Sequence, residues 1–421
     1  MSRGTIWLMA SLLVVTATAV RSAETPQTPQ ALSQQPTNFD GPRRFSHLYS
    51  ATWEEIPIPQ EALQNFIWAT SITDDGTIAG KQGDALVLWH PDAQVWERVP
   101  RVLAPAAVFI SPDGSSIIAT DDTQSILSWN RTDGWQTLAG STVALSGAYN
   151  VSRNFQFAVG NGANQGEASQ GWVWAIDGGV QQMLPNPEWS TSVVATAVSD
   201  DGNVVVGAAV RAPPPGESYP EYLAVRWVSG GLPTQLRAAD GSEIPAAVAC
   251  NADCSMVFGS NGWFLKNNGD FGFLFWSLGG IPDAYPDPYG PYATYSIYDV
   301  SSDGSMVAGL YAQNMYPQNP NSESSVQRPF LWTQATGVVS LRSLGIDDRD
   351  WQFIDAMRLS PDGRRLLIAG VNQSNNPRAA VVHLTPNPVR LTGGHSRHAM
   401  PSPPRANHNG SLRVGPIPMD Q

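Results

Sequence analysis

Short apolar segments separated by polar turns recur along most of the chain. In each recurrence, an apolar segment enters a turn of the type Ser-x-Asp-Gly and a second apolar segment leaves it. The frame occurs at Ala69–Gly76, Ala107–Gly114, Ala148–Phe155, Ala195–Gly202, Ala247–Cys254, Ile297–Gly304 and Ala356–Gly363. Glycine tolerates a positive φ angle, and Ser and Asp side chains accept hydrogen bonds from the free N–H groups of a turn. Each copy therefore predicts a β-hairpin.

A third apolar segment follows most copies and ends near a tryptophan, and a short fourth segment comes after it. The tryptophans at these ends are Trp89, Trp129, Trp174, Trp227, Trp276 and Trp332, and His383 takes this place in the seventh copy. Four short strands repeated at about 40 to 50 residues are typical of a propeller blade. Seven copies predict an all-β, seven-bladed β-propeller over residues 44–385. An open solenoid or two β-sandwich domains is the alternative.

The two ends of the repeat region indicate how the ring closes. The seventh copy stops soon after its third segment, at Leu384, and a spare apolar segment at 51–58 precedes the first copy. This segment resembles the fourth segment of the first copy, at 94–100. A closed ring leaves few exposed sheet edges. We therefore expect the N-terminal strand to complete the last blade.

The repeat is similar to that of a known bacterial family. The pattern A-x-x-V-S-x-D-G-x-x-V-x-G, followed by F-x-W and G-x-x-x-L, resembles the extracellular HAF-repeat family over nearly all of 66–385. The naming tripeptide is absent, and 275–276 and 330–332 are its nearest forms. Ser-Pro-Asp-Gly at 111–114 and 360–363 also resembles TolB-type propeller repeats. Both resemblances imply an exported propeller, and neither implies a catalytic residue.

The ends of the chain differ from the repeats. Residues 1–19 have the charged start, short apolar run and Ala-x-Ala end of a secretory signal peptide, which predicts a periplasmic or extracellular protein. The segments 20–43 and 386–421 are rich in proline and polar residues, which predicts a disordered linker and tail. No later stretch approaches the roughly 20 apolar residues of a transmembrane helix.

Composition restricts the classes of partner. The net charge is −12 and the chain contains only two lysines, Lys81 and Lys266, which argues against nucleic acid as a partner. The sequence lacks a G-x-S-x-G elbow, an H-E-x-x-H motif and a pair of C-x-x-C motifs. We therefore expect a monomer with no cofactor, no metal site and no catalytic residue assignable from sequence.

The number of residues between the second and third apolar segments of each repeat predicts a binding surface. We expect long loops between strands two and three on blades four, five and six, and loops on a rigid scaffold are where binding usually resides. These loops and the connection between blades five and six contain Tyr219, Tyr222, Trp263, Phe264, Tyr285, Tyr289, Tyr292, Tyr295, Tyr311 and Tyr316. Aromatic side chains of this kind are enriched at interfaces, which favours a protein, peptide or glycan partner. In the alternative interpretation, these residues cover their own loops.

Two further alternatives stay open from the sequence. The first is that the propeller is a hydrolase or lyase whose carboxylates converge on the central channel. The second concerns Cys250 and Cys254, which flank a turn in the fifth copy. They form either a local disulfide, as an oxidising compartment would allow, or two buried free thiols.

Overall fold

The computed structural model describes residues 48–387 except for 60–66, 84, 103–107, 121–124, 138–144, 163–168, 214–218, 275–292, 315–324, 345, 347–350, 373 and 375. The predicted signal peptide and linker, and all but the first residues of the predicted tail, lie outside the described residues.

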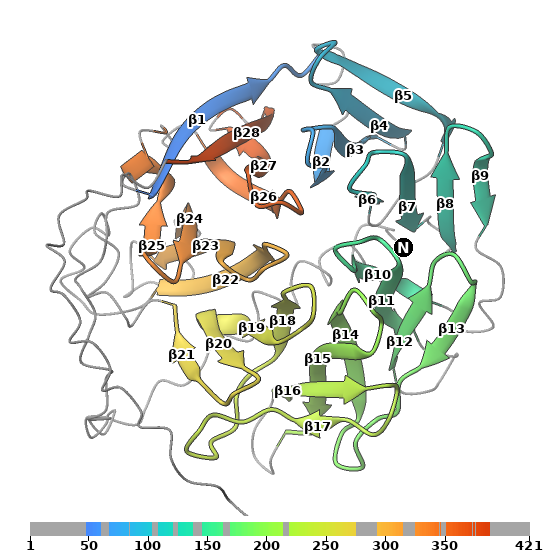
Figure 1. Cartoon of the computed structure of the whole chain (residues 1–421), viewed down its shortest axis with the longest axis vertical. Coiled ribbons are helices and arrows are strands. Elements are labelled where there is room, and N and C mark those ends of the chain that lie inside the picture. Colours follow the sequence, from blue (N-terminus) through green and yellow to red (C-terminus); the bar gives the residue numbers. More distant parts are fainter. Residues whose placement is uncertain are drawn as a thin grey trace, which may run out of the picture. The chain divides into compact units, whose positions relative to one another are not determined.

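Seven four-stranded antiparallel sheets stand around a common centre (Figure 1). Blade one contains β2 (Ile67–Ile72), β3 (Ile78–Gln82), β4 (Ala85–His90) and β5 (Val95–Val102). Blade two contains β6 (Val108–Ile110), β7 (Ser116–Thr120), β8 (Ile126–Asn130) and β9 (Gly134–Thr137). Blade three contains β10 (Leu145–Val151), β11 (Phe157–Gly162), β12 (Gln170–Ala175) and β13 (Val180–Met183). Blade four contains β14 (Ser192–Val198), β15 (Val204–Arg211), β16 (Glu221–Val228) and β17 (Thr234–Gln235).

The remaining blades follow the same order. Blade five contains β18 (Ala247–Cys250), β19 (Met256–Gly259), the 3-10 turn η3 (Ser260–Gly262), β20 (Trp263–Lys266) and β21 (Phe271–Phe273). Blade six contains β22 (Ala293–Val300), β23 (Met306–Asn314), β24 (Ser325–Thr333) and β25 (Gly337–Ser340), followed by η5 (Leu341–Leu344). Blade seven contains β26 (Trp351–Leu359), β27 (Arg365–Asn372), β28 (Pro377–Pro386) and the N-terminal β1 (Tyr49–Ile56). The predicted seven-bladed propeller is confirmed.

The N-terminal strand closes the ring, as the sequence predicts. β1 pairs antiparallel with β28 over eight facing residues, from Tyr49 opposite Pro386 to Ile56 opposite Ala379. Two polar contacts between the strands accompany this ladder. Arg378 makes a two-point ion pair with Glu55 at 2.9 and 3.0 Å, and His383 contacts Glu54 at 3.1 Å. The last blade therefore joins the two ends of the propeller.

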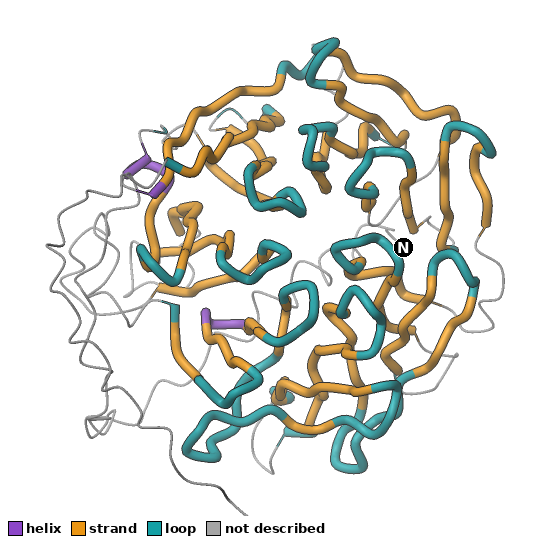
Figure 2. The backbone as a smooth tube through the Cα atoms, viewed as in Figure 1, coloured by secondary structure: helices purple, strands orange, loops and turns teal. Residues whose placement is uncertain are grey.

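The repeated turn makes each inner hairpin for the expected local reasons. Figure 2 shows the loops between first and second strands gathered around the centre of the ring. In the second copy, the hydroxyl of Ser111 donates to Asp113 at 2.6 Å, and its oxygen accepts the N–H of Ser116 at 2.9 Å. The final residue of all seven turns has a positive φ, including Phe155 at 61° and Cys254 at 49° where the other copies have glycine. The turn geometry therefore persists where the residue type departs from the pattern.

The first strand of most blades carries a β-bulge close to the turn. The extra residues are Thr70, Tyr149, Thr196, Val248 and Tyr298, and blade seven has its bulge two positions earlier, at Asp355. A bulge bends the strand and redirects its backbone groups. The hydroxyls of Thr70 and Thr196 use this geometry to donate to a carbonyl of the next blade, each at 3.0 Å.

The core consists of seven large apolar clusters, and each one joins two neighbouring blades. One cluster combines Val206 of blade four with Val257 of blade five, and another combines Ile78 of blade one with Leu367 of blade seven. The remaining clusters fill the other five junctions among the described residues. Because a single small sheet cannot remove its apolar faces from water, this burial requires the ring.

Two predictions about the third strand are wrong. In blade five it is β20, which begins at Trp263 after a three-residue connection and ends before a tight turn at Gly269, where φ is 89°. The predicted strand at 273–276 therefore does not occupy this position, and Trp276 lies outside the described residues. In blade six, Trp332 of the third strand faces Val307 of the second strand. The corresponding pair in blade seven is Val382 and Leu366, so Val382 takes the tryptophan position and His383 does not.

Candidate functional site

The structure separates the aromatic residues that the sequence groups together. Trp263 is fully buried and its indole N–H donates to the carbonyl of Pro245 at 3.0 Å, and Tyr311 in β23 is 4% exposed. Phe264 is half-buried and its ring lies 5.9 Å from that of Trp332. These three side chains pack in the apolar clusters between neighbouring blades. Tyr285, Tyr289, Tyr292 and Tyr316 lie outside the described residues, and Tyr295 lies in β22.

Blade five lacks the predicted long loop. In blades four and six, residues 212–220 and 315–324 separate strands two and three, and 214–218 and 315–324 lie outside the described residues. In blade five the same connection is only η3, because β20 begins directly after it. Blade five therefore contributes no long loop between strands two and three to the expected surface.

Blade four exposes two aromatic side chains at one end of its sheet. Tyr219 precedes β16 and is 63% exposed, and Trp189 precedes β14 and is 39% exposed. Both β14 and β16 are antiparallel to β15, so their first residues lie at the same end of the blade. The register confirms this arrangement, since Val210 of β15 faces both Ser192 of β14 and the half-buried Tyr222 of β16. We call Trp189, Tyr219 and Tyr222 the blade-four edge.

Trp189 escaped the sequence analysis although a signal was available. It stands in the connection between blades three and four, close to Pro185 and Pro187. Connections between blades lie at the same end as the loops between strands two and three. The same argument that selected the connection between blades five and six therefore applies to this one.

A charged network lies beside the blade-four edge. Arg211, at the end of β15, contacts Glu221 of β16 and also donates two hydrogen bonds to Glu243, at 2.7 and 3.1 Å. The hydrogen bonds from Arg211 lower the pKa of Glu243 to about 2. Glu243 also contacts Arg237 at 3.2 Å. These contacts connect the long loop of blade four to the segment that leads into blade five.

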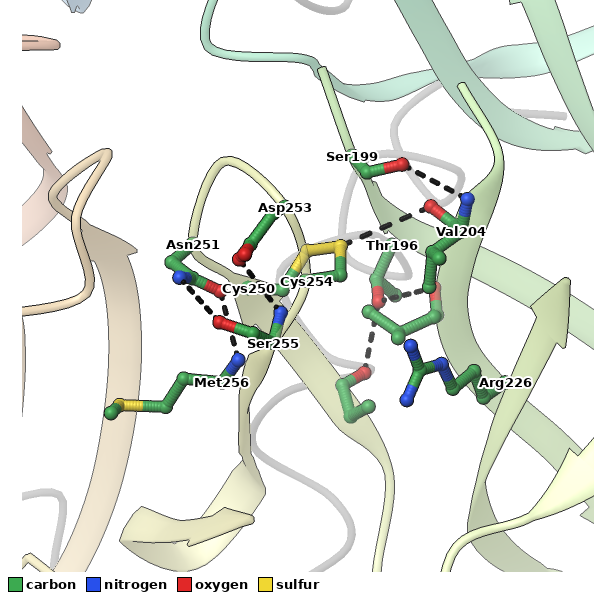
Figure 3. The surroundings of a disulfide bond; sticks show 12 residues. Thr196, Ser199, Val204, Arg226, Cys250, Asn251, Asp253, Cys254, Ser255 and Met256 are labelled. Atoms are coloured by element: carbon green, nitrogen blue, oxygen red, sulfur yellow. Dashed lines mark hydrogen bonds between the residues drawn. A yellow bond between two sulfur atoms is a disulfide. The ribbon is translucent and has the colours of Figure 1, made fainter. Parts of the chain in front are cut away.

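Cys250 and Cys254 are joined by a disulfide across the turn of blade five (Figure 3). Both residues are buried in the cluster between blades four and five, and Cys254 Sγ lies 3.9 Å from the carbonyl oxygen of Val204. In place of the serine of other copies, Asn251 accepts the N–H of Met256 at 2.9 Å. The bond therefore spans an intact repeat turn and fills space against the neighbouring blade.

The centre of the ring contains a polar cavity that the sequence analysis missed. The third positions of the seven frames are Ser71, Phe109, Asn150, Ala197, Ala249, Asp299 and Arg358. Five of them, all except the two alanines, line one cavity of about 40 Å³. The available signal was the change of this position from small residues to Asn, Asp and Arg in some copies. We call this space the axial cavity.

An ion pair crosses the axial cavity. Arg153, in the turn of blade three, contacts Asp299 of blade six, which is 4% exposed. Asp299 also accepts the N–H groups of Val300 at 2.9 Å and of Leu359, in blade seven, at 2.8 Å. One carboxylate therefore connects three blades.

The enzyme alternative predicts three or more carboxylates, or a carboxylate–histidine pair, in the central channel. Asp299 is the one carboxylate among the residues that line the axial cavity. Within the described part of the chain, no three His, Cys, Asp or Glu side chains come close enough to hold a metal ion. The described lining of the axial cavity therefore contains one carboxylate and no histidine.

The architecture and its closing strand define a closed seven-bladed β-propeller. No protein-family model matches the chain, and no curated protein is similar to it in sequence. The resemblance to the HAF-repeat family therefore stays a prediction. Among the described residues, no helix has the length and apolar character that crossing a membrane requires.

Several solved structures match the chain. An oligogalacturonate lyase from Vibrio parahaemolyticus matches with a TM-score of 0.50 and 11% identity, over 79% of this chain and 97% of its own. The β-propeller domain of the Trilobed protease from Pyrococcus furiosus matches with a TM-score of 0.49 and 9% identity, over 76% and 97%. TolB from Acinetobacter baumannii matches with a TM-score of 0.37 and 12% identity, over 72% and 59%. At these identities the similarity concerns the fold alone.

Proposed function

We propose that this protein is an exported binding platform, whose rigid ring presents the blade-four edge to a protein, peptide or glycan partner. The observation that carries the proposal is the exposure of Trp189 and Tyr219 at the same end of one blade. Large aromatic side chains contribute much contact area with few rotatable bonds, which is why they dominate binding surfaces.

The surroundings of the two rings support this role. The Arg211 network holds the strand ends beside them, and the sheet beneath them is part of a closed ring. A preorganised surface loses less conformational entropy on binding than a free loop does. The predicted signal peptide would deliver the platform to the periplasm or the medium.

The test compares three forms of the protein as bait. The double variant Trp189→Ala/Tyr219→Ala removes both exposed rings. The matched control Val228→Ala/Leu232→Ala removes two exposed apolar side chains at the opposite end of the same blade, where Leu232 is 78% exposed. Envelope extract, culture medium and a glycan array serve as sources of partner, and retained molecules are identified by mass spectrometry or array position.

We expect the wild type and the control to retain the same partner and the double variant to lose it. All three proteins should have the same melting temperature within a few degrees, since the replaced side chains are exposed. Equal retention by the double variant and the control would refute the role of this edge. Failure of the wild type to retain any specific molecule would refute the platform.

A further inference from the structure

The axial cavity is lined by hydrogen-bond donors that have no partner among the described residues. Asn150 uses its carboxamide oxygen to accept the N–H of Val151 at 3.0 Å, and its NH₂ group has no partner among the described residues. The hydroxyl oxygen of Ser71 accepts the N–H of Ile110 at 3.3 Å, which leaves its proton free to be donated. Both side chains line the cavity. Unsatisfied donors of this kind favour an acceptor ligand.

The two arginines of the cavity differ in their ion pairing. Arg358 donates from Nη1 to the carbonyl of Tyr298 at 2.8 Å and from Nε to that of Thr70 at 3.3 Å. These partners are neutral bulge carbonyls, so they orient the guanidinium without balancing its charge. Among the described residues, the one carboxylate of the cavity, Asp299, is paired with Arg153. Arg153 also lies beside Asp200, which accepts the N–H of Asn154 at 3.0 Å, whereas Arg358 has no ion-pair partner among the described residues.

The carboxylate of Asp299 is held by other groups and makes no ion pair with Arg358 among the described contacts. Its Oδ1 contacts Arg153 and the N–H of Val300, and its Oδ2 accepts the N–H of Leu359. Each oxygen is already engaged by a group of the protein, and the whole residue is 4% exposed. An anion from outside the chain would meet Arg358 without competing for these bonds.

We propose that the axial cavity binds the carboxylate group of a small organic acid. Arg358 supplies the charge, Asn150 and Ser71 supply neutral donors, and the free N–H groups of Arg153 complete the set. A guanidinium and a carboxylate form charge-assisted hydrogen bonds of matching geometry. The cavity has a volume of about 40 Å³, which is enough for a few water molecules. A carboxylate group is of similar size.

Solvent can reach the site from the face that bears the turns. The Arg153 side chain is 17% exposed, and the turn prolines Pro112 and Pro361, both half-buried, also line the cavity. This site is separate from the blade-four edge, since blade four contributes no residue to the cavity lining. The binding of an acid here therefore does not depend on the proposed platform function.

The test titrates the full protein with sodium acetate, which replaces sodium chloride at constant ionic strength. Asn150→Asp places a negative charge among the donors and removes the NH₂ group. Asn372→Asp is the matched control, because Asn372 also uses its carboxamide oxygen for local N–H groups and does not line the cavity. Binding is measured as the rise in Tm with acetate concentration and by calorimetric titration, with acetamide as the neutral analogue of the ligand.

We expect acetate to raise the Tm of the wild type and of Asn372→Asp, and acetamide to have no effect. The charge introduced by Asn150→Asp should lower the affinity for acetate by at least about tenfold. Asn150→Ala, which adds no charge, should lower it by roughly tenfold, as expected for one hydrogen bond to a charged group, and it provides the test if the aspartate variant does not fold.

Two results would overturn the proposal. One is a wild-type protein that responds equally to acetate and acetamide, or to neither. The other is an acetate response that the Asn150 variants leave unchanged. A tripeptide with a free carboxyl end, compared with its amidated form, shows whether the carboxylate of a peptide enters as well as that of a free acid.

Discussion

The closing strand offers a direct test of the ring, and Ile56 is the residue that reports on it. This side chain belongs to β1 and is 2% exposed. It packs in the cluster between blades seven and one, which contains Leu367 and Val381 of blade seven and Ile72 and Trp89 of blade one. Replacement by alanine removes buried methyl groups and leaves a cavity at the junction. Such changes cost about 2–5 kcal/mol, and we expect about 3 kcal/mol for Ile56→Ala.

The magnitude translates into a measurable shift. For a chain of this length, a loss of about 3 kcal/mol corresponds to a fall in Tm of roughly 4 °C. Circular dichroism at the β-sheet band and urea unfolding measure the two quantities independently. Thr52→Ala is the control, because Thr52 is exposed on the same strand and its replacement should change stability by no more than about 0.5 kcal/mol.

Deletion of residues 44–58 removes the whole ladder between β1 and β28, so it should reduce stability by more than Ile56→Ala does. The reasoning fails if Ile56→Ala and Thr52→Ala melt at the same temperature, or if the deletion leaves the melt unchanged. Either outcome would mean that the contact between the last and first blades contributes nothing to the stability of the ring.

Three other predictions follow from the turns and the charged network. Gly202→Ala should reduce the free energy of unfolding by about 2–3 kcal/mol more than Gly114→Ala does. Both glycines have a positive φ, but the new Cβ would lie 2.4 Å from a phenyl ring at Gly202, whereas its nearest neighbour at Gly114 would be 3.8 Å away. Urea unfolding of both variants measures the difference. The pKa of Glu243 falls from 4.5 to about 2 on folding, so its contribution to stability is complete above pH 4.5 and is lost as the pH falls toward 2. Glu243→Gln should therefore flatten the acid limb of a stability–pH profile, and a parallel limb would contradict the assignment. Intact mass after alkylation without reductant should show no adduct on Cys250 or Cys254, and two adducts would contradict the disulfide.

The repeat was predictable because its determinants are local. A residue with positive φ ends each turn, and the serine and aspartate that bond within the turn lie within a few positions of it, as Ser199 and Asp201 do at 2.6 Å. Phe155 departs from the glycine preference, and it was placed correctly only because its neighbours keep the frame. The closing strand was predictable for a related reason, since a spare strand at one end matches a missing strand at the other.

The third strand of blade five was misplaced because an apolar segment and a tryptophan occur twice after the turn. The sequence offers both Trp263 and Trp276, and the repeat spacing favours the later one. In the structure the third strand begins at Trp263, because the tight turn at Gly269 ends β20 before Trp276 is reached. The same error converted the buried Trp263 into a predicted surface residue.

The sequence by itself determined the number of blades, the turns and the means of closure, because these depend on residues a few positions apart or on matching ends. Only the tertiary structure decided which side chains meet at the centre. Arg153 of blade three lies 146 positions before Asp299 of blade six, and Arg358 belongs to the next blade, so no local pattern in the sequence places the three side chains together. Closure of the ring brings them together, so the axial cavity is a property of the assembled propeller and not of any one repeat.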